Sequence, residues 1–341
     1  FDKSNIKPNL TKQNMINEQV VISRTPLRVS FVGGGTDMPY FYNKFTGATI
    51  SCAINRYVYV TAKFHNNFQE KYRLNYSITE NVKSVDKIKN LRIREVIKKL
   101  KITKPLYINT FADIPANSGL GSSSSFTVGL IHALSKLDNK NFSKKEMAEM
   151  AYSIEAKITN NSLGKQDHYI ASFGGIKHIE YKKNRILISS IILDKKKVEY
   201  LFNSFLLIWT KKNRLSVNVL KDQKKNIKKN YINLIILNKF TKDFLNEIKK
   251  QKLNIKKMGE IISETWNLKK GFSQFVADVN INRIYKQVIK GISYGGKLLG
   301  AGNGGFILIM FDLKKRNKII KSLKKYQYIN VKLDKNGTVI L

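Results

Sequence analysis

The stretch Pro115-Ala-Asn-Ser-Gly-Leu-Gly-Ser-Ser-Ser-Ser125 lies between a predicted strand at Leu106 to Phe111 and a predicted helix at about Gly121 to Lys136. Glycines let backbone N–H groups turn toward a ligand without a clash at Cβ. The first turn of a helix adds unpaired N–H donors and a partial positive charge. A glycine loop that opens a helix therefore predicts a phosphate-binding site.

This loop is not a Walker A motif, because no Gly-Lys-Ser/Thr follows its glycines. The alternative is a Ser/Gly-rich loop that only caps an ordinary helix. Consecutive serines directly after Gly-Leu-Gly favour phosphate binding, since their hydroxyls can also bond phosphate oxygens or ligate Mg²⁺. The predicted nucleotide-binding residues are Pro115, Asn117, Ser118, Gly119, Leu120, Gly121, Ser122, Ser123 and Ser124.

The rest of the chain alternates strands and helices irregularly, which predicts an α+β fold and no regular βαβ repeat. The expected elements are strands at Val20 to Phe31, Ala53 to Phe64, Ile176 to Tyr181, Ile186 to Leu193, Phe205 to Trp209, Lys297 to Leu299, Phe306 to Phe311 and Tyr328 to Leu333, with helices at Leu91 to Leu100, from Ser143, Ser216 to Lys252, Lys256 to Asn267, Ile281 to Tyr294 and Lys314 to Lys325. Ser143 and Glu146 form a capping-box signature. The Asp194-Lys-Lys-Lys197 run is the predicted boundary between domains at 15–195 and 196–341.

The 341 residues carry a formal net charge of +38, which raises the alternative of a basic nucleic-acid-binding protein. The lysines are spread through predicted amphipathic helices, which favours a solvated surface that attracts anionic substrates. We expect neither a nucleic-acid nor a membrane partner. No apolar run is long enough to cross a bilayer, and the histidines and the single cysteine have no zinc-ligand spacing.

One cysteine, Cys52, cannot form an intramolecular disulfide, which favours a reducing compartment. With no signal-peptide pattern at the polar N-terminus, we expect a cytoplasmic protein. Met15 is the expected native start, and the residues before it are left out of the fold prediction. A homodimer is compatible with the sequence.

Three motifs resemble those of the GHMP kinases, a family that includes galactokinase, homoserine kinase and mevalonate kinase. Pro115 to Ser123 is similar to the family's central Pro-x-x-x-Gly-Leu-Gly-Ser-Ser motif. Pro26 to Asp37 resembles its N-terminal motif, and Lys297 to Phe306 its C-terminal glycine motif. The resemblance implies an ATP-dependent kinase with a ribosomal-protein-like N-terminal domain, a ferredoxin-like C-terminal domain and an active site in the cleft between them.

Within the family, the strings Arg24 to Asp37 and Gly164-Lys-Gln-Asp167 resemble the D-glycero-D-manno-heptose 7-phosphate kinase branch. That branch implies phosphorylation of the anomeric hydroxyl to give the 1,7-bisphosphate, a step toward nucleotide-activated heptose for surface polysaccharide. Fucokinase-like enzymes share parts of the pattern and remain the alternative within the family.

The resemblance also assigns roles to residues. It implies that Asp167 accepts or orients the proton of the attacking hydroxyl, and that Arg28 stabilises phosphoryl charge or polarises the nucleophile. It also implies that Glu155 holds Mg²⁺ together with a loop serine, for which Ser123 matches best and Ser122 is the alternative. Taken alone, Asp167 could be a helix cap, Glu155 a salt-bridge residue, and Arg28 a surface arginine.

The substrate side is expected at the N-terminal and C-terminal glycine motifs. The predicted substrate-binding residues are Gly34, Gly35, Thr36, Asp37, Lys165, Gly302 and Asn303. Lys165 is the candidate for a second anion site, or for lowering the pKa of Asp167, and the sequence does not separate these roles. Asn303 replaces a glycine that the family often has, and Asn tolerates the positive φ that such a loop needs.

Overall fold

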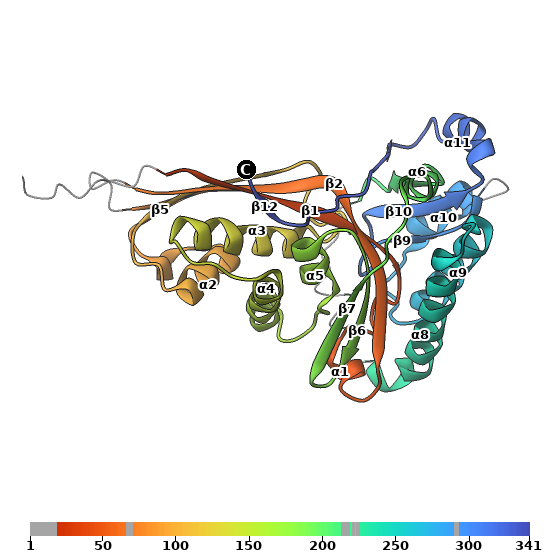
Figure 1. Ribbon diagram of the computed structural model, residues 1–341, viewed down its shortest axis with the longest axis horizontal. Helices are drawn as coiled ribbons and strands as arrows, with labels where there is room; N and C mark the ends of the chain where they lie inside the picture. Colours follow the sequence, from red (N-terminus) through yellow and green to blue (C-terminus); the bar gives the residue numbers. More distant parts are fainter. Residues whose placement is uncertain (1–18, 66–70, 213–218, 220–221, 223–225, 290–292) are drawn as a thin grey trace, which may run out of the picture.

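Two sheets with flanking helices form an elongated molecule (Figure 1). The computed structural model describes residues 19–65, 71–212, 219, 222, 226–289 and 293–341. The expected start at Met15 and the first part of the predicted Ser216 to Lys252 helix lie outside the described residues, apart from isolated positions in that helix. The α+β prediction is confirmed.

The first sheet is built on the long hairpin of β1 (Val21–Val32) and β2 (Gly47–Phe64). Its order is β12-β1-β2-β5-β3-β4, and β2 pairs with β5 at one end and with β6 at the other. The remaining strands are β3 (Tyr72–Asn75), β4 (Thr79–Val82), β5 (Leu106–Ala112), β6 (Ile176–Lys182), β7 (Arg185–Ser190) and β12 (Val339–Ile340). The prediction began β2 too late, because its first half is buried on both faces and shows no alternation.

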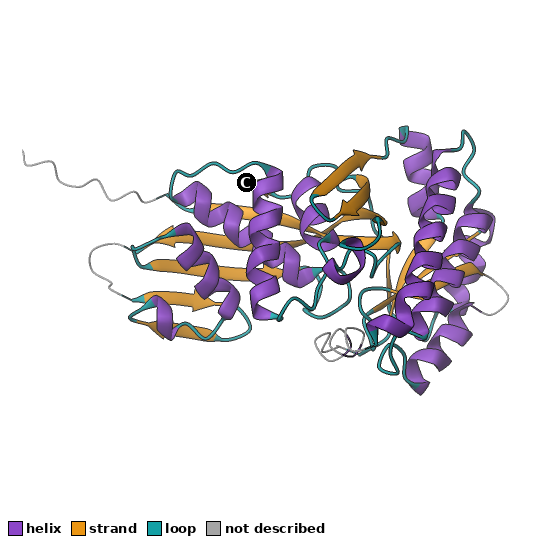
Figure 2. Ribbon diagram, turned by 90° about the horizontal axis from the view of Figure 1, so that it is seen from below, coloured by secondary structure: helices purple, strands orange, loops and turns teal. Residues whose placement is uncertain are grey.

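The helices of this half cover one face of the first sheet (Figure 2). They are α2 (Leu91–Leu100), α3 (Ser122–Leu137), α4 (Lys144–Ile158) and α5 (Gln166–Phe173), with the 3₁₀ turn η1 (Val85–Lys87). The one-turn helix α1 (Pro39–Tyr42) instead contacts a helix of the second half. α3 packs against both β1 and β2, which fixes the position of the loop that precedes it. The capping box predicted at Ser143 and Glu146 is confirmed at the start of α4.

The second sheet has the order β11-β8-β10-β9 and is antiparallel throughout. Numbered along the chain, its strands stand in the order 4-1-3-2, as in a ferredoxin-like fold. Its elements are α6 (Lys195–Asn203), β8 (Phe205–Trp209), α8 (Ile227–Lys249), α9 (Ile255–Lys270), α10 (Val279–Ile289), β9 (Ser293–Leu298), β10 (Phe306–Phe311), η2 (Leu313–Lys315), α11 (Arg316–Ser322) and β11 (Tyr328–Ile329).

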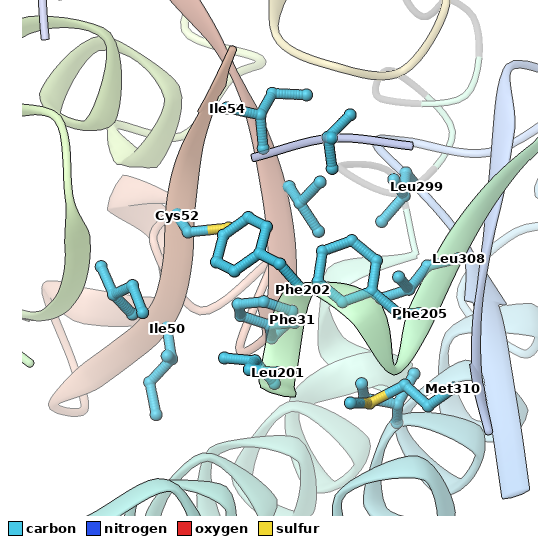
Figure 3. Close-up of a cluster of buried hydrophobic side chains, with 14 of the residues drawn as sticks. Phe31, Ile50, Cys52, Ile54, Leu201, Phe202, Phe205, Leu299, Leu308 and Met310 are labelled. Atoms are coloured by element: carbon cyan, nitrogen blue, oxygen red, sulfur yellow. The ribbon is translucent and has the colours of Figure 1, made fainter. Parts of the chain in front are cut away.

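A shared hydrophobic cluster joins the two sheets (Figure 3). Phe31 of β1 lies edge-on to Phe205 of β8, with ring centroids 6.0 Å apart, and stacks on Phe244 of α8 at 5.4 Å. All three rings are almost fully buried. Burying each such side chain stabilises the fold by roughly 1.5–3 kcal/mol, so the two halves share one core and hold a fixed geometry at their junction.

Several boundaries in the second half differ from the sequence prediction, and β11 and α11 are shorter than expected. The helix expected to end at Tyr294 ends at Ile289, and β9 begins at Ser293. β9 lies close to α9, since a Cβ at Gly295 would lie 2.1 Å from the carbonyl oxygen of Gly259. The Asp194 run begins a helix, because the Asp194 side chain caps α6, and the domain division at 195/196 stays a prediction.

In the parts of the chain that the structure describes, the helices fall short of the length and apolarity that crossing a bilayer would require.

Candidate active site

A cavity lies where the two halves meet and is lined by residues of both. From the first half come the phosphate loop, the turn after β1 and the start of α5. From the second half come Lys269 at the end of α9, Lys297 on β9 and Gly300 in the glycine loop. The expected cleft between the halves is therefore present.

The phosphate loop forms one wall, where α3 begins. Gly121 caps the helix at φ 79° with no side-chain bond to the first turn, which leaves the early amide groups of α3 free of a side-chain cap. Six of the predicted nucleotide-binding residues line the cavity: Asn117, Gly119, Gly121, Ser122, Ser123 and Ser124. Pro115, Ser118 and Leu120 do not, since Pro115 is exposed while Ser118 and Leu120 are fully buried.

The C-terminal glycine loop packs directly on the phosphate loop. A Cβ at Gly119 would lie 2.8 Å from the carbonyl oxygen of Leu299, and one at Gly305 would lie 2.2 Å from that of Ser118. Asn303 has φ 60°, which confirms that asparagine supplies the positive φ expected there. Its side chain accepts a hydrogen bond from Lys212, and the cavity is lined by Gly300 and Ala301 instead of Gly302 and Asn303.

Arg28 and Asp167 both line the cavity and form a bidentate ion pair. The Arg28 Nε and Nη2 atoms donate to the two carboxylate oxygens of Asp167, each at 2.7 Å. Arg28 Nη1 also donates to the carbonyl oxygen of Gly119 at 2.6 Å. The Arg28 side chain is 5 % exposed and that of Asp167 is 27 % exposed, so the carboxylate is the member that a ligand can reach.

Asp37 lies beside this pair and is almost buried. Its Oδ1 accepts from the Gly35 amide at 2.9 Å, and its Oδ2 accepts from the Gln166 amide at 3.1 Å. Burial, and to a lesser extent the charge of Asp167, raises the pKa of Asp37 above its ordinary value, against the effect of these amides. The fit is tight, since a Cβ at Gly164 would lie 1.9 Å from Asp37 Oδ2.

Thr36 and Lys165, also predicted for substrate binding, point elsewhere. The Thr36 hydroxyl bonds the carbonyl oxygens of Gly33 and Ala48 and so holds the turn. The Lys165 ammonium bonds both carboxylate oxygens of Glu149 and lies over the Tyr152 ring, 4.7 Å from its centroid. In this structure the charge of Lys165 is paired with Glu149 and Lys165 does not line the cavity, so its role in substrate binding stays a prediction.

Glu155 of α4 is the most densely bonded carboxylate of the site. Its oxygens accept from the hydroxyls of Ser123, Ser124 and Thr127 and from Arg92 Nε at 2.5 Å, and one bonds His168 Nε2 at 2.9 Å. Burial acts to raise the pKa of Glu155, but the hydrogen bond to His168 and the charge of Arg92 outweigh it and hold this pKa well below its ordinary value. Glu155 is therefore a buried carboxylate kept in its charged form.

The predicted Mg²⁺ ligands Ser123 and Glu155 are in direct contact. One carboxylate and one hydroxyl are hard oxygen donors, and Mg²⁺ usually takes few protein ligands, so the pair fits this ion. In the described residues no cluster of three or more His, Cys, Asp or Glu side chains could hold a metal. Arg92 supplies the positive charge against Glu155 in the structure.

Sequence reasoning missed Arg92 and His168, both of which contact Glu155. Arg92 is 63 positions away from Glu155, and nothing in its predicted basic helix marks it as different from its neighbours. His168 had a signal, because it directly follows Asp167 in the string that the family resemblance used.

Comparison with known proteins finds similarity to the GHMP kinases. The profile of the GHMP kinases N terminal domain matches residues 88–175, which include the phosphate loop, Glu155 and Asp167. The D-glycero-alpha-D-manno-heptose 7-phosphate kinase of Campylobacter jejuni is 28% identical over 91% of this chain and 94% of its own length. The chain contains a GHMP kinases N terminal domain and is similar to a GHMP kinase over most of its length. It is an ATP-dependent kinase, with ATP as a substrate.

Solved structures show the same fold. A D-glycero-D-manno-heptose 1-phosphate kinase from Bacteroides thetaiotaomicron superposes with a TM-score of 0.77 at 22% identity, covering 94% of this chain and 98% of that one. Lactococcus lactis galactokinase, solved with galactose, has a TM-score of 0.74 at 18% identity, covering 95% of this chain and 96% of that one. The GHMP fold predicted from the motifs is thus confirmed.

Proposed function

We propose that this GHMP kinase transfers the γ-phosphoryl group of ATP to the anomeric hydroxyl of D-glycero-D-manno-heptose 7-phosphate. The observation that carries the proposal is the position of Asp167, which is open to a cavity walled on one side by the phosphate loop. The product would be the 1,7-bisphosphate, a precursor of nucleotide-activated heptose for surface polysaccharide.

The ATP phosphates would lie against the first turn of α3. Asn117 to Ser124 bring amides and hydroxyls to the cavity, and phosphate oxygens accept hydrogen bonds from both. The positive end of the α3 dipole adds attraction. For the buried Ser118 and Leu120 and the exposed Pro115, direct contact with ATP stays a prediction.

Asp167 would orient the sugar hydroxyl and accept its proton. The sugar oxygen attacks the γ-phosphorus, the bond from that phosphorus to the β,γ-bridging oxygen breaks, and ADP leaves with the bond's electron pair. A carboxylate has about four lone-pair sites, so Asp167 can accept from the hydroxyl while Arg28 occupies two of them. Arg28 fixes the carboxylate through its rigid fork and places a permanent positive charge beside the transferred group.

Ser123 and Glu155 would hold Mg²⁺, which when bound neutralises charge on the nucleotide phosphates. Both Glu155 oxygens are aligned by donors from α2, α3 and α5, so the carboxylate is already oriented toward Ser123. Asp37 would accept hydrogen bonds from sugar hydroxyls.

The heptose phosphate acceptor is supported by the Campylobacter jejuni relative, whose name places the acceptor phosphate on carbon 7. The heptose kinase with the same fold is named for a 1-phosphate. These names imply different acceptor hydroxyls, and fucokinase-like enzymes would take an unphosphorylated sugar.

An ADP-release assay with Mg-ATP separates these acceptors. We expect ADP formation with the heptose 7-phosphate, and much less with the heptose 1-phosphate, free heptose or fucose. Preferred turnover of the 1-phosphate or of fucose would overturn the assignment of the acceptor. No sugar-dependent ADP release across the panel would overturn the sugar kinase itself.

A further inference from the structure

Lys297 is a buried lysine in the wall of the cavity. The residue is only 4% exposed, yet it is among those that line the cavity. Its Nζ makes one hydrogen bond, to the carbonyl oxygen of Phe31 at 3.1 Å. An ammonium group has three donors, so this contact satisfies only part of the group.

Lys297 has no acidic partner within the described residues. Its charged neighbours are cations, Lys269 and Arg28, and Arg28 is already paired with Asp167. Burial first, and then these positive neighbours, lowers the pKa of Lys297 well below that of an ordinary lysine. Buried charges in folded proteins are normally paired, so Lys297 lacks a negative partner.

The position of Lys297 points to the acceptor side of the cavity. Phe31 is near the end of β1, and the chain continues from there into the turn that holds Asp37. Lys269 bonds the carbonyl oxygen of Gly300, at the edge of the glycine loop. The amides and hydroxyls of the phosphate loop, by contrast, are contributed by Asn117 to Ser124.

We propose that Lys297, with Lys269, binds the phosphate monoester carried by the acceptor sugar. The proposal rests on the proposed function and adds to it the residues that distinguish a phosphorylated sugar from a free one. A phosphate dianion supplies the missing negative partner, and its oxygens accept hydrogen bonds from the remaining N–H groups of Lys297. A free sugar leaves the buried ammonium without that partner, which is how sites built around a polar group reject analogues that lack it.

The test compares wild type with Lys297→Met and with Lys257→Met, a matched control on the exposed surface of α9. The measured quantity is the ratio of kcat/KM for heptose 7-phosphate to that for free heptose at saturating Mg-ATP. We expect Lys297→Met to lower this ratio at least about tenfold, chiefly through KM for the phosphorylated sugar, since a charge-assisted hydrogen bond is lost. Lys269→Met should lower it in the same direction, and Lys257→Met should leave it unchanged.

An unchanged ratio in a folded Lys297→Met variant would overturn the proposal. So would a rise in KM for ATP alone, because Lys297 would then serve the nucleotide's phosphates. If wild type shows no sugar-dependent ADP release, the proposed function fails separately. Calorimetry with inorganic phosphate then tests the anion site directly: about tenfold weaker binding by Lys297→Met supports it, and equal binding overturns it.

Discussion

The guanidinium of Arg28 donates hydrogen bonds to both carboxylate oxygens of Asp167, at 2.7 Å each, although the two residues lie 139 positions apart. Gly121 of the phosphate loop abuts the same pair, since a Cβ there would lie 3.1 Å from Arg28 Cγ and 3.4 Å from Asp167 Oδ2. One contact thus joins β1, the phosphate loop and α5 at the place where we propose that the phosphoryl group moves.

Replacing Asp167 by Asn removes the proton acceptor and keeps the shape. We expect Asp167→Asn to lower kcat roughly 10²–10⁴-fold, the usual contribution of a positioned acid or base, while the affinity for Mg-ADP stays within about twofold. Steady-state turnover and calorimetric ADP binding measure the two quantities. Asp194→Asn is the matched control, because Asn caps α6 as well as Asp does. Wild-type turnover in Asp167→Asn would remove this residue from the chemistry.

Arg28→Lys keeps the positive charge but removes the two parallel guanidinium donors that bind Asp167. A lysine can bond only one Asp167 oxygen well, so the carboxylate loses its fixed orientation. Losing one hydrogen bond between charged groups costs about 1.5–3 kcal/mol, which corresponds to a fall in kcat of roughly 10- to 100-fold. KM for ATP should change little, and kinetics at saturating sugar provide the comparison. A variant with normal kcat and a raised KM for ATP would show that Arg28 only binds nucleotide.

Glu155→Gln should destabilise the protein in a pH-dependent way. Because the pKa of Glu155 is lowered in the folded state, its charge stabilises the fold above the ordinary value of 4.5, and this contribution is lost as the pH falls below 4.5. Breaking a buried ion pair costs about 3 kcal/mol, so we expect a loss of that order at pH 7. Denaturant unfolding of both proteins at several pH values measures the difference. The difference in unfolding free energy between wild type and Glu155→Gln should shrink as the pH is lowered. A difference that does not depend on pH would contradict the proposal that Glu155 is a buried charge.

The variant also tests the proposed metal ligand, because Mg²⁺ has an effect that can be measured without turnover. We expect Mg²⁺ to shift the thermal midpoint of the ADP-bound wild type and to shift that of Glu155→Gln much less. Glu260→Gln, on the exposed face of α9, serves as the control. Equal Mg²⁺ shifts in wild type and Glu155→Gln would count against Glu155 as a ligand.

Gly164→Ala should displace Asp37. The added Cβ would overlap Asp37 Oδ2, so either the carboxylate or the start of α5 must move. Overpacking of this kind costs about 1–3 kcal/mol of stability. We expect KM for the sugar to rise at least about tenfold, a displacement worth about 1.4 kcal/mol, while ADP affinity is retained. Unchanged sugar kinetics would indicate that Asp37 does not contact the acceptor.

Lys297→Met should make the free enzyme more stable at neutral pH. The folded state binds the Lys297 proton less readily than the unfolded state, so the lysine penalises folding below its ordinary pKa of 10.5, and the penalty shrinks as the pH rises toward that value. We expect a gain of about 1–3 kcal/mol at pH 7 that diminishes toward pH 10. Lower stability of the variant at both pH values would show that Lys297 supports the fold.

The sequence predicted the elements and residues whose signals are local. The strand, glycine turn and helix around Gly121 and the capping box at Ser143 needed only neighbouring residues to be recognised. The Arg28–Asp167 and Arg92–Glu155 pairs could not be predicted from spacing, because the sheet and α2 bring them together over long separations. The ion pair of Lys165 with Glu149 likewise appears only in the structure.

Phosphorus NMR of the reaction products tests the central claim most directly. With Mg-ATP and D-glycero-D-manno-heptose 7-phosphate, we predict ADP together with a sugar that carries two phosphates, the new one coupled to the anomeric proton. A new phosphate on any other carbon, or ADP with inorganic phosphate and unmodified sugar, would contradict transfer to the anomeric hydroxyl in this cavity.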